Sequence, residues 1–146
     1  MRIAGIKHGS LVDGTGIRTS IFLSGCSHDC EGCHNKEFQA FDYGIDMTIN
    51  EVLDDIRNDL KFIDGITLTG GDPLFQEKEV IELLELIRED KDFKNLSIWL
   101  YTGFLYEEIS ENIKKYVNVI VDGKYDKNLP KGDWCGSNNQ RVIKVR

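Results

Sequence analysis

Short apolar runs alternate along the chain with longer segments in which apolar residues recur every three or four positions. The short runs are typical of strands, and the longer segments are typical of helices that bury one face. The expected strands cover residues 20–23, 66–69, 96–101 and 119–121. The expected helices cover residues 49–63, 80–87 and 105–115. Thr48 and Glu51 have the spacing of a capping box and predict the start of the first helix.

This regular alternation of strand and helix predicts βαβ units around a mostly parallel sheet. Doubly wound sheets and barrels are the commonest folds of this kind. A complete (β/α)8 barrel needs about 250 residues. At roughly 30 residues per βαβ unit, the 146 residues of this chain supply only part of one. We therefore expect an α/β fold in the form of a partial, laterally open TIM-like barrel, with residues 1–146 as one domain.

Composition and charge narrow the class of protein. Hydrophobic residues make up 40% of the chain, which is enough for a packed core. The net charge of −7 argues against binding to nucleic acids or to anionic membranes. No apolar run approaches the roughly 20 residues of a membrane helix, and no apolar segment near Met1 indicates a secretory signal. We therefore expect a cytoplasmic protein whose four cysteines are ligands or reactive thiols rather than disulfides.

Three of the cysteines, Cys26, Cys30 and Cys33, follow the first expected strand with C-x3-C-x2-C spacing. A loop this short brings the three sulfur atoms together, and neighbouring thiolates repel one another unless a metal holds them. Three thiolates leave one iron of a 4Fe-4S cluster without a protein ligand, and a substrate can bind there. A structural zinc site completed by His28 or His34 is the alternative. The cysteine loop therefore predicts a metal centre of one of these two kinds.

A glycine-rich turn, Gly-Gly-Asp-Pro at 70–73, follows the second expected strand. The glycines leave backbone groups uncovered, so that a ligand can approach closely. A plain strand-to-helix turn, with Asp72 as the N-cap and Pro73 at the first helical position, fits the same residues. This turn, the cysteine loop and the segments 101–103 and 121–124 all follow expected strands. We expect them to meet at the carboxyl edge of the sheet, where α/β folds place their active sites.

Several other residues have less specific surroundings. We expect His28 to be an exposed spacer between ligands and Trp99 to belong to the core. Asn35 is expected to form hydrogen bonds with carbonyl groups of the loop. Cys135 is expected to be a partly buried thiol that packs as a small hydrophobic residue and not a fourth metal ligand. Arg18 fits either an ion pair near the cysteine loop or a contact with a partner.

These motifs resemble those of the radical S-adenosylmethionine enzymes, in which a C-x3-C-x2-C loop after one strand accompanies a Gly-Gly-acidic-Pro turn after the next. Within that superfamily the chain resembles the activases of glycyl-radical enzymes, in particular those of the anaerobic ribonucleotide reductase. The resemblance covers nearly the whole chain, although Cys135 stands where these activases usually carry an Arg. The matching motifs are Val-Asp-Gly-Thr-Gly-Ile-Arg at 12–18, Cys-His-Asn-Lys at 33–36, Leu-Thr-Gly-Gly-Asp-Pro-Leu at 68–74, Tyr-Thr-Gly at 101–103, Val-Asp-Gly-Lys at 121–124 and Gly-Ser-Asn-Asn-Gln at 136–140.

The resemblance implies one radical S-adenosylmethionine domain over residues 1–146, with three groups of site residues. The ligands of a 4Fe-4S cluster would be Cys26, Cys30 and Cys33. The residues that receive the methionyl end of S-adenosylmethionine, mainly through backbone atoms, would be Gly70, Gly71 and Asp72. The residues that lie against the adenine, again mainly through the backbone, would be Gly32, Cys33 and His34.

The resemblance also implies a reaction and its partners. One electron from the cluster would cleave S-adenosylmethionine to methionine and a 5′-deoxyadenosyl radical, which would take a hydrogen atom from a glycine of the reductase. The implied partners are the large subunit of the anaerobic ribonucleoside-triphosphate reductase and a low-potential electron donor such as flavodoxin or ferredoxin. A laterally open fold would admit a loop of that protein substrate.

Two alternatives stay open at this point. One is a radical enzyme of the same fold that acts on a small molecule, as in deazapurine biosynthesis. The other is a zinc-binding adaptor without enzymatic activity. A chain of 146 residues has few residues to spare for enclosing a small substrate, which favours the activase over the first alternative.

Overall fold

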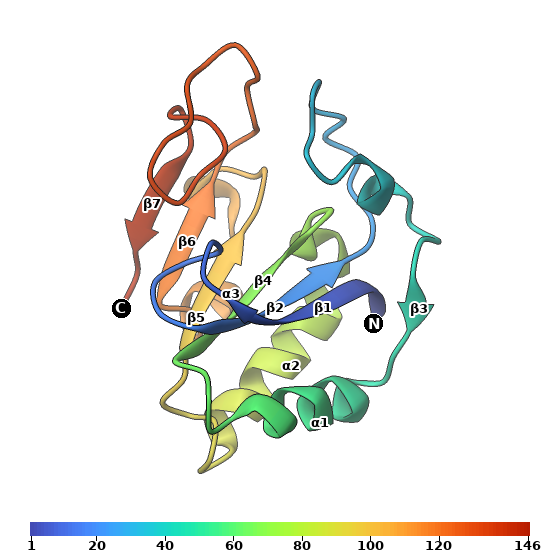
Figure 1. Cartoon of the computed structure of the whole chain (residues 1–146), viewed down its shortest axis with the longest axis vertical. Coiled ribbons are helices and arrows are strands. Elements are labelled where there is room, and N and C mark those ends of the chain that lie inside the picture. Colours follow the sequence, from blue (N-terminus) through green and yellow to red (C-terminus); the bar gives the residue numbers. More distant parts are fainter.

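A seven-stranded sheet organises the chain in the computed structural model, which describes residues 1–146 (Figure 1). The strand order is β3-β1-β2-β4-β5-β6-β7. The central strands β2, β4, β5 and β6 are parallel, whereas β1, β3 and β7 are antiparallel to their neighbours. The strands are β1 (Arg2–Ser10), β2 (Arg18–Leu23), β3 (Ile45–Asp46), β4 (Gly65–Gly70), β5 (Ser97–Tyr101), β6 (Val119–Asp122) and β7 (Arg141–Lys144).

The four expected strands are confirmed as β2, β4, β5 and β6. The outer strands were not expected from the sequence, because β3 has only two residues, β7 is mostly exposed and the apolar residues of β1 do not alternate. The sheet does not close, since β3 and β7 are its two ends. The fold is therefore mixed α/β around an open sheet that is parallel in the middle, and the expected barrel is not confirmed.

Three α-helices and three short 3-10 helices connect the strands. They are α1 (Ile49–Asp59), α2 (Glu77–Glu89), α3 (Glu111–Lys114), η1 (Lys36–Gln39), η2 (Pro73–Gln76) and η3 (Tyr106–Glu108). The capping box of α1 is confirmed: the N–H of Glu51 donates to the Thr48 hydroxyl at 3.1 Å, and the N–H of Thr48 donates to the Glu51 carboxylate at 3.0 Å. No helix combines the length and the apolar character that crossing a membrane requires.

The continuous helix expected over 105–115 is wrong. The segment forms η3 and α3 instead, and Ile109 and Ser110 between them have extended backbone. The Ser110 hydroxyl donates to Glu77 at the start of α2, at 2.9 Å. Ile109 and Ile113 are nevertheless both buried. The four-residue spacing of these isoleucines therefore does not require one continuous helix. Ile109 reaches the core from the extended link, and Ile113 reaches it from α3.

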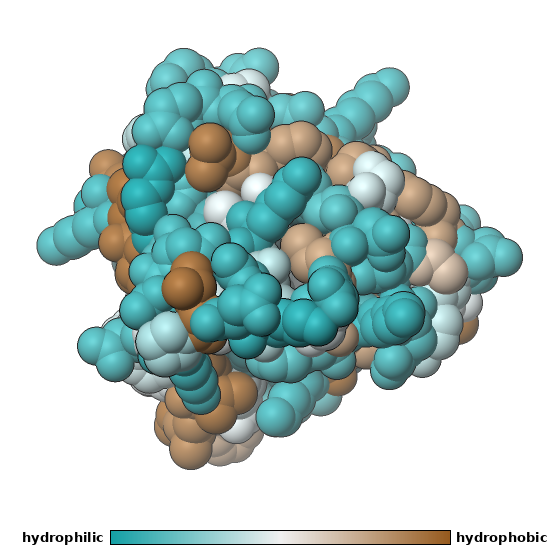
Figure 2. Space-filling view, turned by 90° about the horizontal axis from the view of Figure 1, so that it is seen from above, coloured by the Kyte–Doolittle hydropathy of each residue, from teal (hydrophilic) through white to brown (hydrophobic).

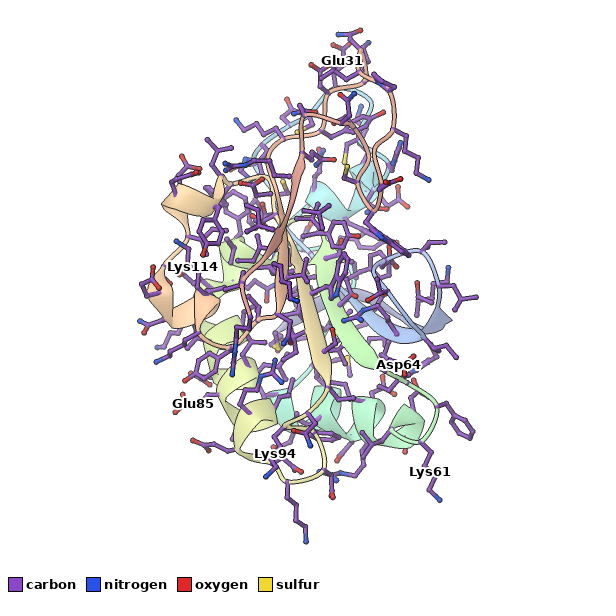
Figure 3. All side chains as sticks on the ribbon, turned by 90° about the vertical axis from the view of Figure 1, so that its left-hand side faces the viewer. Glu31, Lys61, Asp64, Glu85, Lys94 and Lys114 are labelled. Carbon is purple, nitrogen blue, oxygen red and sulfur yellow. The ribbon has the colours of Figure 1, made fainter.

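The helices cover one face of the sheet, which Figure 3 presents from the side. Alternate residues of the central strands point toward the helices, and most of these side chains are aliphatic, with Thr19 as a polar exception that donates to Asp59 of α1. Burial of this apolar surface stabilises the fold. The core on this face includes Ile21, Leu68, Ile98 and Ile120 from the strands and Val52, Leu83 and Ile113 from the helices.

The opposite face of the sheet holds a buried arginine. Arg18 is 0% exposed and donates to the Thr67 hydroxyl and to the carbonyls of Ile66 and Ser97, each at 2.7 Å. Its guanidinium lies 5.5 Å from the centre of the Trp99 ring. Burial lowers the pKa of Arg18 to about 10, so it stays charged at neutral pH. Both roles considered for Arg18 are wrong, because this side chain joins β2, β4 and β5 from within the fold.

Candidate metal centre

A cavity of about 750 Å³ lies at the carboxyl ends of the central strands. Figure 3 marks this end of the molecule with Glu31 and the opposite end with Lys61 and Lys94. From above, this end presents a mainly hydrophilic surface with separate hydrophobic patches (Figure 2). The segments after β2, β4, β5 and β6 all contribute to the cavity wall, which confirms that they meet at this edge. The lining residues from these segments include Cys26, Cys30, Cys33, Gly70, Gly71, Thr102, Gly103 and Lys124.

Cys26, Cys30 and Cys33 line this cavity as free, half-buried thiols. Burial raises the pKa of Cys26 to about 11, so its thiol keeps the proton at neutral pH and releases it on binding a metal. The cavity volume falls within the range of about 300–1,000 Å³ that is typical of small-molecule sites. Three free thiols beside such a space fit a cluster with three protein ligands and one open iron.

The Gly-Gly-Asp turn is fastened to the cysteine loop through the backbone. The N–H of Gly71 donates to the carbonyl of Leu23 at 2.8 Å, and the N–H of Asp72 donates to that of Gly25 at 2.9 Å. A Cβ atom at Gly70 would lie 2.4 Å from backbone atoms of Leu23, and one at Gly71 would lie 2.7 Å from the Gly25 oxygen. The glycines are therefore needed for this close backbone packing, and the two N–H donors are used within the protein.

Asp72 connects three segments of the site through its buried carboxylate, which is only 1% exposed. The carboxylate caps η2 by accepting the N–H of Leu74 at 3.0 Å, which confirms the expected strand-to-helix turn. It also accepts the Thr102 hydroxyl at 2.9 Å and the N–H of Gly103 at 2.8 Å. Its fourth partner is Nε2 of His28, at 2.8 Å. Asp72 does not line the cavity.

The expectation that His28 is an exposed spacer is wrong. Its imidazole is 9% exposed, and its ring centre lies 5.3 Å from that of Phe75 and 4.6 Å from that of Phe104. His28 and Asp72 are 44 positions apart, and no local sequence pattern predicts a contact over that separation. The contact arises only when the loops after two neighbouring strands meet at one edge of the sheet.

Three of these groups also form a compact set of possible ligands. One ligand atom from each of Cys26, His28 and Asp72 lies within 4.8 Å of the other two. A thiol, an imidazole and a carboxylate are all groups that bind zinc. The structure therefore keeps a mononuclear site as an alternative use of Cys26.

The remaining predicted residues lie at the edge of the site. His34 is exposed and lines the cavity, and its ring centre lies 4.9 Å from that of Tyr125. Gly32 does not line the cavity. Asn35 also lines the cavity, and its amide donates to the carbonyl of Gly70 at 3.3 Å, at the end of β4 and not in the cysteine loop as expected.

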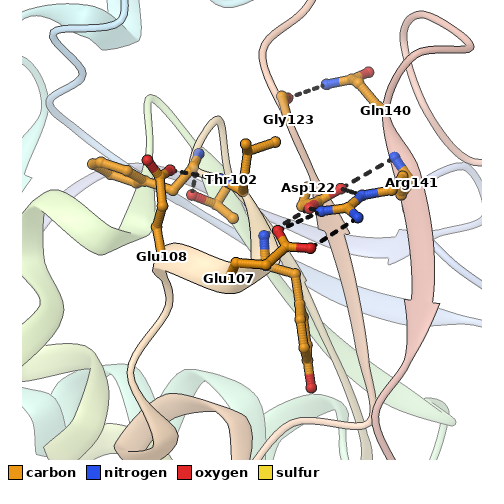
Figure 4. A network of polar contacts seen from close by, with 10 residues as sticks. Thr102, Glu107, Glu108, Asp122, Gly123, Gln140 and Arg141 are labelled. Carbon is orange, nitrogen blue, oxygen red and sulfur yellow. Dashed lines mark hydrogen bonds and ion pairs between the residues drawn. The ribbon is translucent and has the colours of Figure 1, made fainter.

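The Gly-Ser-Asn-Asn-Gln stretch at 136–140, here called the tail motif, holds the segment after β6 against β7, a role that was not predicted from the sequence. The Gln140 side chain accepts the N–H of Gly136 at 2.9 Å and donates to the carbonyl of Gly123 at 2.9 Å. Next to it, Arg141 donates to the buried Asp122 carboxylate at 3.1 Å (Figure 4). These contacts fix one wall of the cavity. The sequence signal for this role was a glutamine at the end of a turn-forming stretch rich in glycine and asparagine.

Cys135 lies on this wall as expected for a small apolar residue. It is 7% exposed and packs with Trp99 and Val121, so the expected core position of Trp99 is also confirmed. The neighbouring Trp134 is 37% exposed, and its ring centre lies 5.9 Å from that of Trp99. Cys135 is a free thiol in the structure.

Comparison with known proteins gives consistent matches over most of the chain. A family model described as a 4Fe-4S single cluster domain matches residues 12–143. An anaerobic ribonucleoside-triphosphate reductase-activating protein from Enterobacteria phage T4 is 43% identical over 136 residues, which cover 90% of this chain and 86% of the phage protein. Proteins of the same name from Escherichia coli (strain K12) and Vibrio cholerae are 36% and 34% identical, and each alignment covers at least 90% of both chains. The family model supports an iron–sulfur cluster in this chain.

Proposed function

This chain belongs to the family of anaerobic ribonucleoside-triphosphate reductase-activating proteins, and we propose on that basis that it activates such a reductase by forming a glycyl radical on its large subunit. The observation that carries the proposal is that three free thiols and the Gly-Gly turn line one cavity. We take residues 1–146 as one radical S-adenosylmethionine domain. A low-potential carrier such as flavodoxin or ferredoxin would supply the electron.

The cysteine loop would hold the metal cofactor. Cys26, Cys30 and Cys33 would ligate a 4Fe-4S cluster and leave one iron open. When bound, the cluster would supply one electron to S-adenosylmethionine, giving methionine and an adenosyl radical that takes a hydrogen atom from a glycine of the reductase. Each thiol must lose its proton to become a ligand, so cluster binding is expected to release protons.

The walls of the cavity would orient S-adenosylmethionine. The backbone of Gly70, Gly71 and Asp72 would receive the methionyl end, with Gly70 and Gly71 lining the cavity and Asp72 behind them. The N–H groups of Gly71 and Asp72 are bonded within the protein and would not take part. The carboxylate of Asp72 is engaged within the protein and is not free for this role. The residues against the adenine would be Gly32, Cys33 and His34, of which the last two line the cavity.

Exposed apolar side chains at the cavity favour a protein substrate over a small molecule. Leu11 and Val12 are 65% and 67% exposed, and both line the cavity together with Trp134. Exposed apolar groups around a site are typical of surfaces that bind other proteins. The cavity would thus receive a polypeptide loop at this side.

A zinc site is the second candidate, since Cys26, His28 and Asp72 form a compact set of ligand groups. Metal analysis separates the two candidates. The 4Fe-4S proposal predicts about four irons and four sulfides per chain after anaerobic reconstitution. One zinc per chain, with no sulfide, would favour the adaptor.

The reaction itself is tested by its products. We expect the reduced, reconstituted protein to convert S-adenosylmethionine to methionine and 5′-deoxyadenosine, measured by liquid chromatography. Cys30→Ala should abolish this cleavage, because the cluster loses one of its three protein ligands. The matched control is Cys135→Ser, which changes a thiol outside the cysteine loop and should retain cleavage. A fully active Cys30→Ala protein would contradict the ligand assignment.

A further inference from the structure

We propose that His28 is a positioning residue, which holds the cysteine loop against the Gly-Gly-Asp turn by donating to the Asp72 carboxylate. This inference rests on the proposed function, because it concerns the relative placement of the cluster and of S-adenosylmethionine. His28 contacts neither of these groups in its proposed role. It acts through Asp72, on which the two halves of the site converge.

The first support is the hydrogen bonding of the Asp72 carboxylate. A buried carboxylate needs donors for its oxygen atoms, and this one has four donor groups. Leu74 belongs to its own turn, whereas Thr102 and Gly103 belong to the loop after β5. His28 is the donor from the cysteine loop. Without this donor, the side-chain link between Asp72 and the cysteine loop would be lost.

The second support is the fitted environment of the imidazole. The ring packs against Phe75 and Phe104, which also contact each other, and only 9% of the side chain is exposed. A Cβ atom at position 103 would lie 2.5 Å from Cδ2 of His28, so the absence of a side chain at Gly103 makes room for the ring. A loop histidine without a role would be solvated, whereas this one is packed on several sides.

The hydrogen bond between His28 and Asp72 affects the proposed cluster ligands because His28 lies among them in the loop. One residue separates it from Cys26 on one side, Ser27, and one from Cys30 on the other, Asp29. A displacement of the imidazole therefore moves the backbone that carries two of the three thiols. Contacts behind a metal ligand orient that ligand, and removing them typically weakens a site even when the ligands themselves remain.

Two substitutions separate the hydrogen bond from the packing. His28→Phe keeps an aromatic ring against the two phenylalanines but has no donor for Asp72. His28→Gln keeps an N–H donor at about the same distance from the backbone. Ser27→Ala is the matched control, because Ser27 is the exposed neighbour of His28 in the same loop.

The first measurement is the affinity of the reconstituted protein for S-adenosylmethionine. Binding is monitored through the change that the ligand causes in the electron paramagnetic resonance spectrum of the reduced cluster. We expect His28→Phe to raise the Kd at least about tenfold, in line with the loss of groups behind a metal ligand. His28→Gln should restore the Kd to within about threefold of the unmodified protein, and Ser27→Ala should leave it unchanged. An unchanged Kd in His28→Phe would overturn the proposal.

The second measurement uses the metal-free chain and does not depend on activity. Hydrogen exchange should be faster in His28→Phe than in the unmodified chain, both at residues 26–34 and at the N–H of Gly103, with His28→Gln close to the unmodified chain. Equal exchange in all three chains would overturn the proposal. If the unmodified protein does not bind S-adenosylmethionine, the proposed function fails, whereas hydrogen exchange still tests whether His28 holds the loop against the turn. Zinc binding that is lost in both His28 variants would make His28 a ligand and would also overturn it.

Discussion

The two faces of the sheet are built from different kinds of residue, although the same four parallel strands supply both. The helix-covered face has an apolar core that includes Leu68 and Ile98, and the buried Thr19 on this face donates to Asp59 of α1. The opposite face has the buried Arg18, the hydroxyl of Thr67 and the Trp99 ring. The loop that contains Gly14 covers this face from one side and the segment that contains Trp134 from the other. Alternation along each strand therefore separates a packing face from a face of directional contacts.

This difference explains where a site can form. Apolar burial is non-directional, so it stabilises the fold without fixing individual atoms. Hydrogen bonds have defined geometry, and the carboxyl edge next to the polar face is held by them. Asp72, Gln140 and Arg18 each connect segments that are far apart in the sequence. The cavity is accordingly bounded by segments whose positions are set by polar contacts.

The largest effect on stability should come from the helix-covered face. Leu68→Ala removes a fully buried side chain, and we expect a loss of about 2–5 kcal/mol in the free energy of unfolding. Leu86→Ala on α2 is the control, because Leu86 is 40% exposed and should cost much less. Urea unfolding of both variants measures the difference. Equal losses would show that burial on this face does not dominate stability.

A smaller but clear loss is expected on the polar face. Arg18→Lys keeps the charge but cannot reproduce the planar set of donors, so at least one of the carbonyls of Ile66 and Ser97 loses its partner. We expect a loss of about 1–3 kcal/mol in the free energy of unfolding. Arg57→Lys is the surface control, since the ion pairs of Arg57 are exposed and screened by solvent, and it should cost less than Arg18→Lys. An Arg18→Lys protein as stable as its control would refute the structural role of the guanidinium.

The smallest effect on stability should come from Cys135, whose thiol lies on the cavity wall formed by the segment before β7. Cys135→Ser replaces a buried thiol that packs with Trp99 and Val121, and we expect a loss of roughly 1 kcal/mol. Iron content after reconstitution should be unchanged, because three cysteines of the loop already supply the proposed ligands. Loss of iron equal to that of Cys26→Ala would instead make Cys135 a fourth ligand and would close the site.

The sequence predicts the packing face better than the polar face. The periods of two and of three to four residues identified β2, β4, β5, β6, α1 and α2, because apolar burial repeats along the chain. The same signal gave a continuous helix over 105–115, although Ile109 is extended. The segments that directly follow the expected parallel strands were also correctly predicted to meet at the carboxyl edge of the sheet. These features depend on local patterns.

The contacts that complete the site do not follow from local patterns. His28 and Asp72 become partners only through the sheet, and nothing in the residues around either one indicates a buried histidine. The contacts of Arg18 span strands that begin 47 and 79 positions further along. The antiparallel strands β1 and β7 are likewise defined by their neighbours more than by their own periodicity. Long-range polar partners of this kind require the fold.

The central claim is that this chain forms a glycyl radical on its reductase, and electron paramagnetic resonance tests it most directly. The reconstituted protein is mixed without oxygen with S-adenosylmethionine, a reductant and the anaerobic ribonucleoside-triphosphate reductase. We predict a stable glycyl radical signal on the reductase, absent when S-adenosylmethionine is omitted and absent with Cys30→Ala. No such signal from a mixture in which the protein carries a full cluster and cleaves S-adenosylmethionine would contradict the claim.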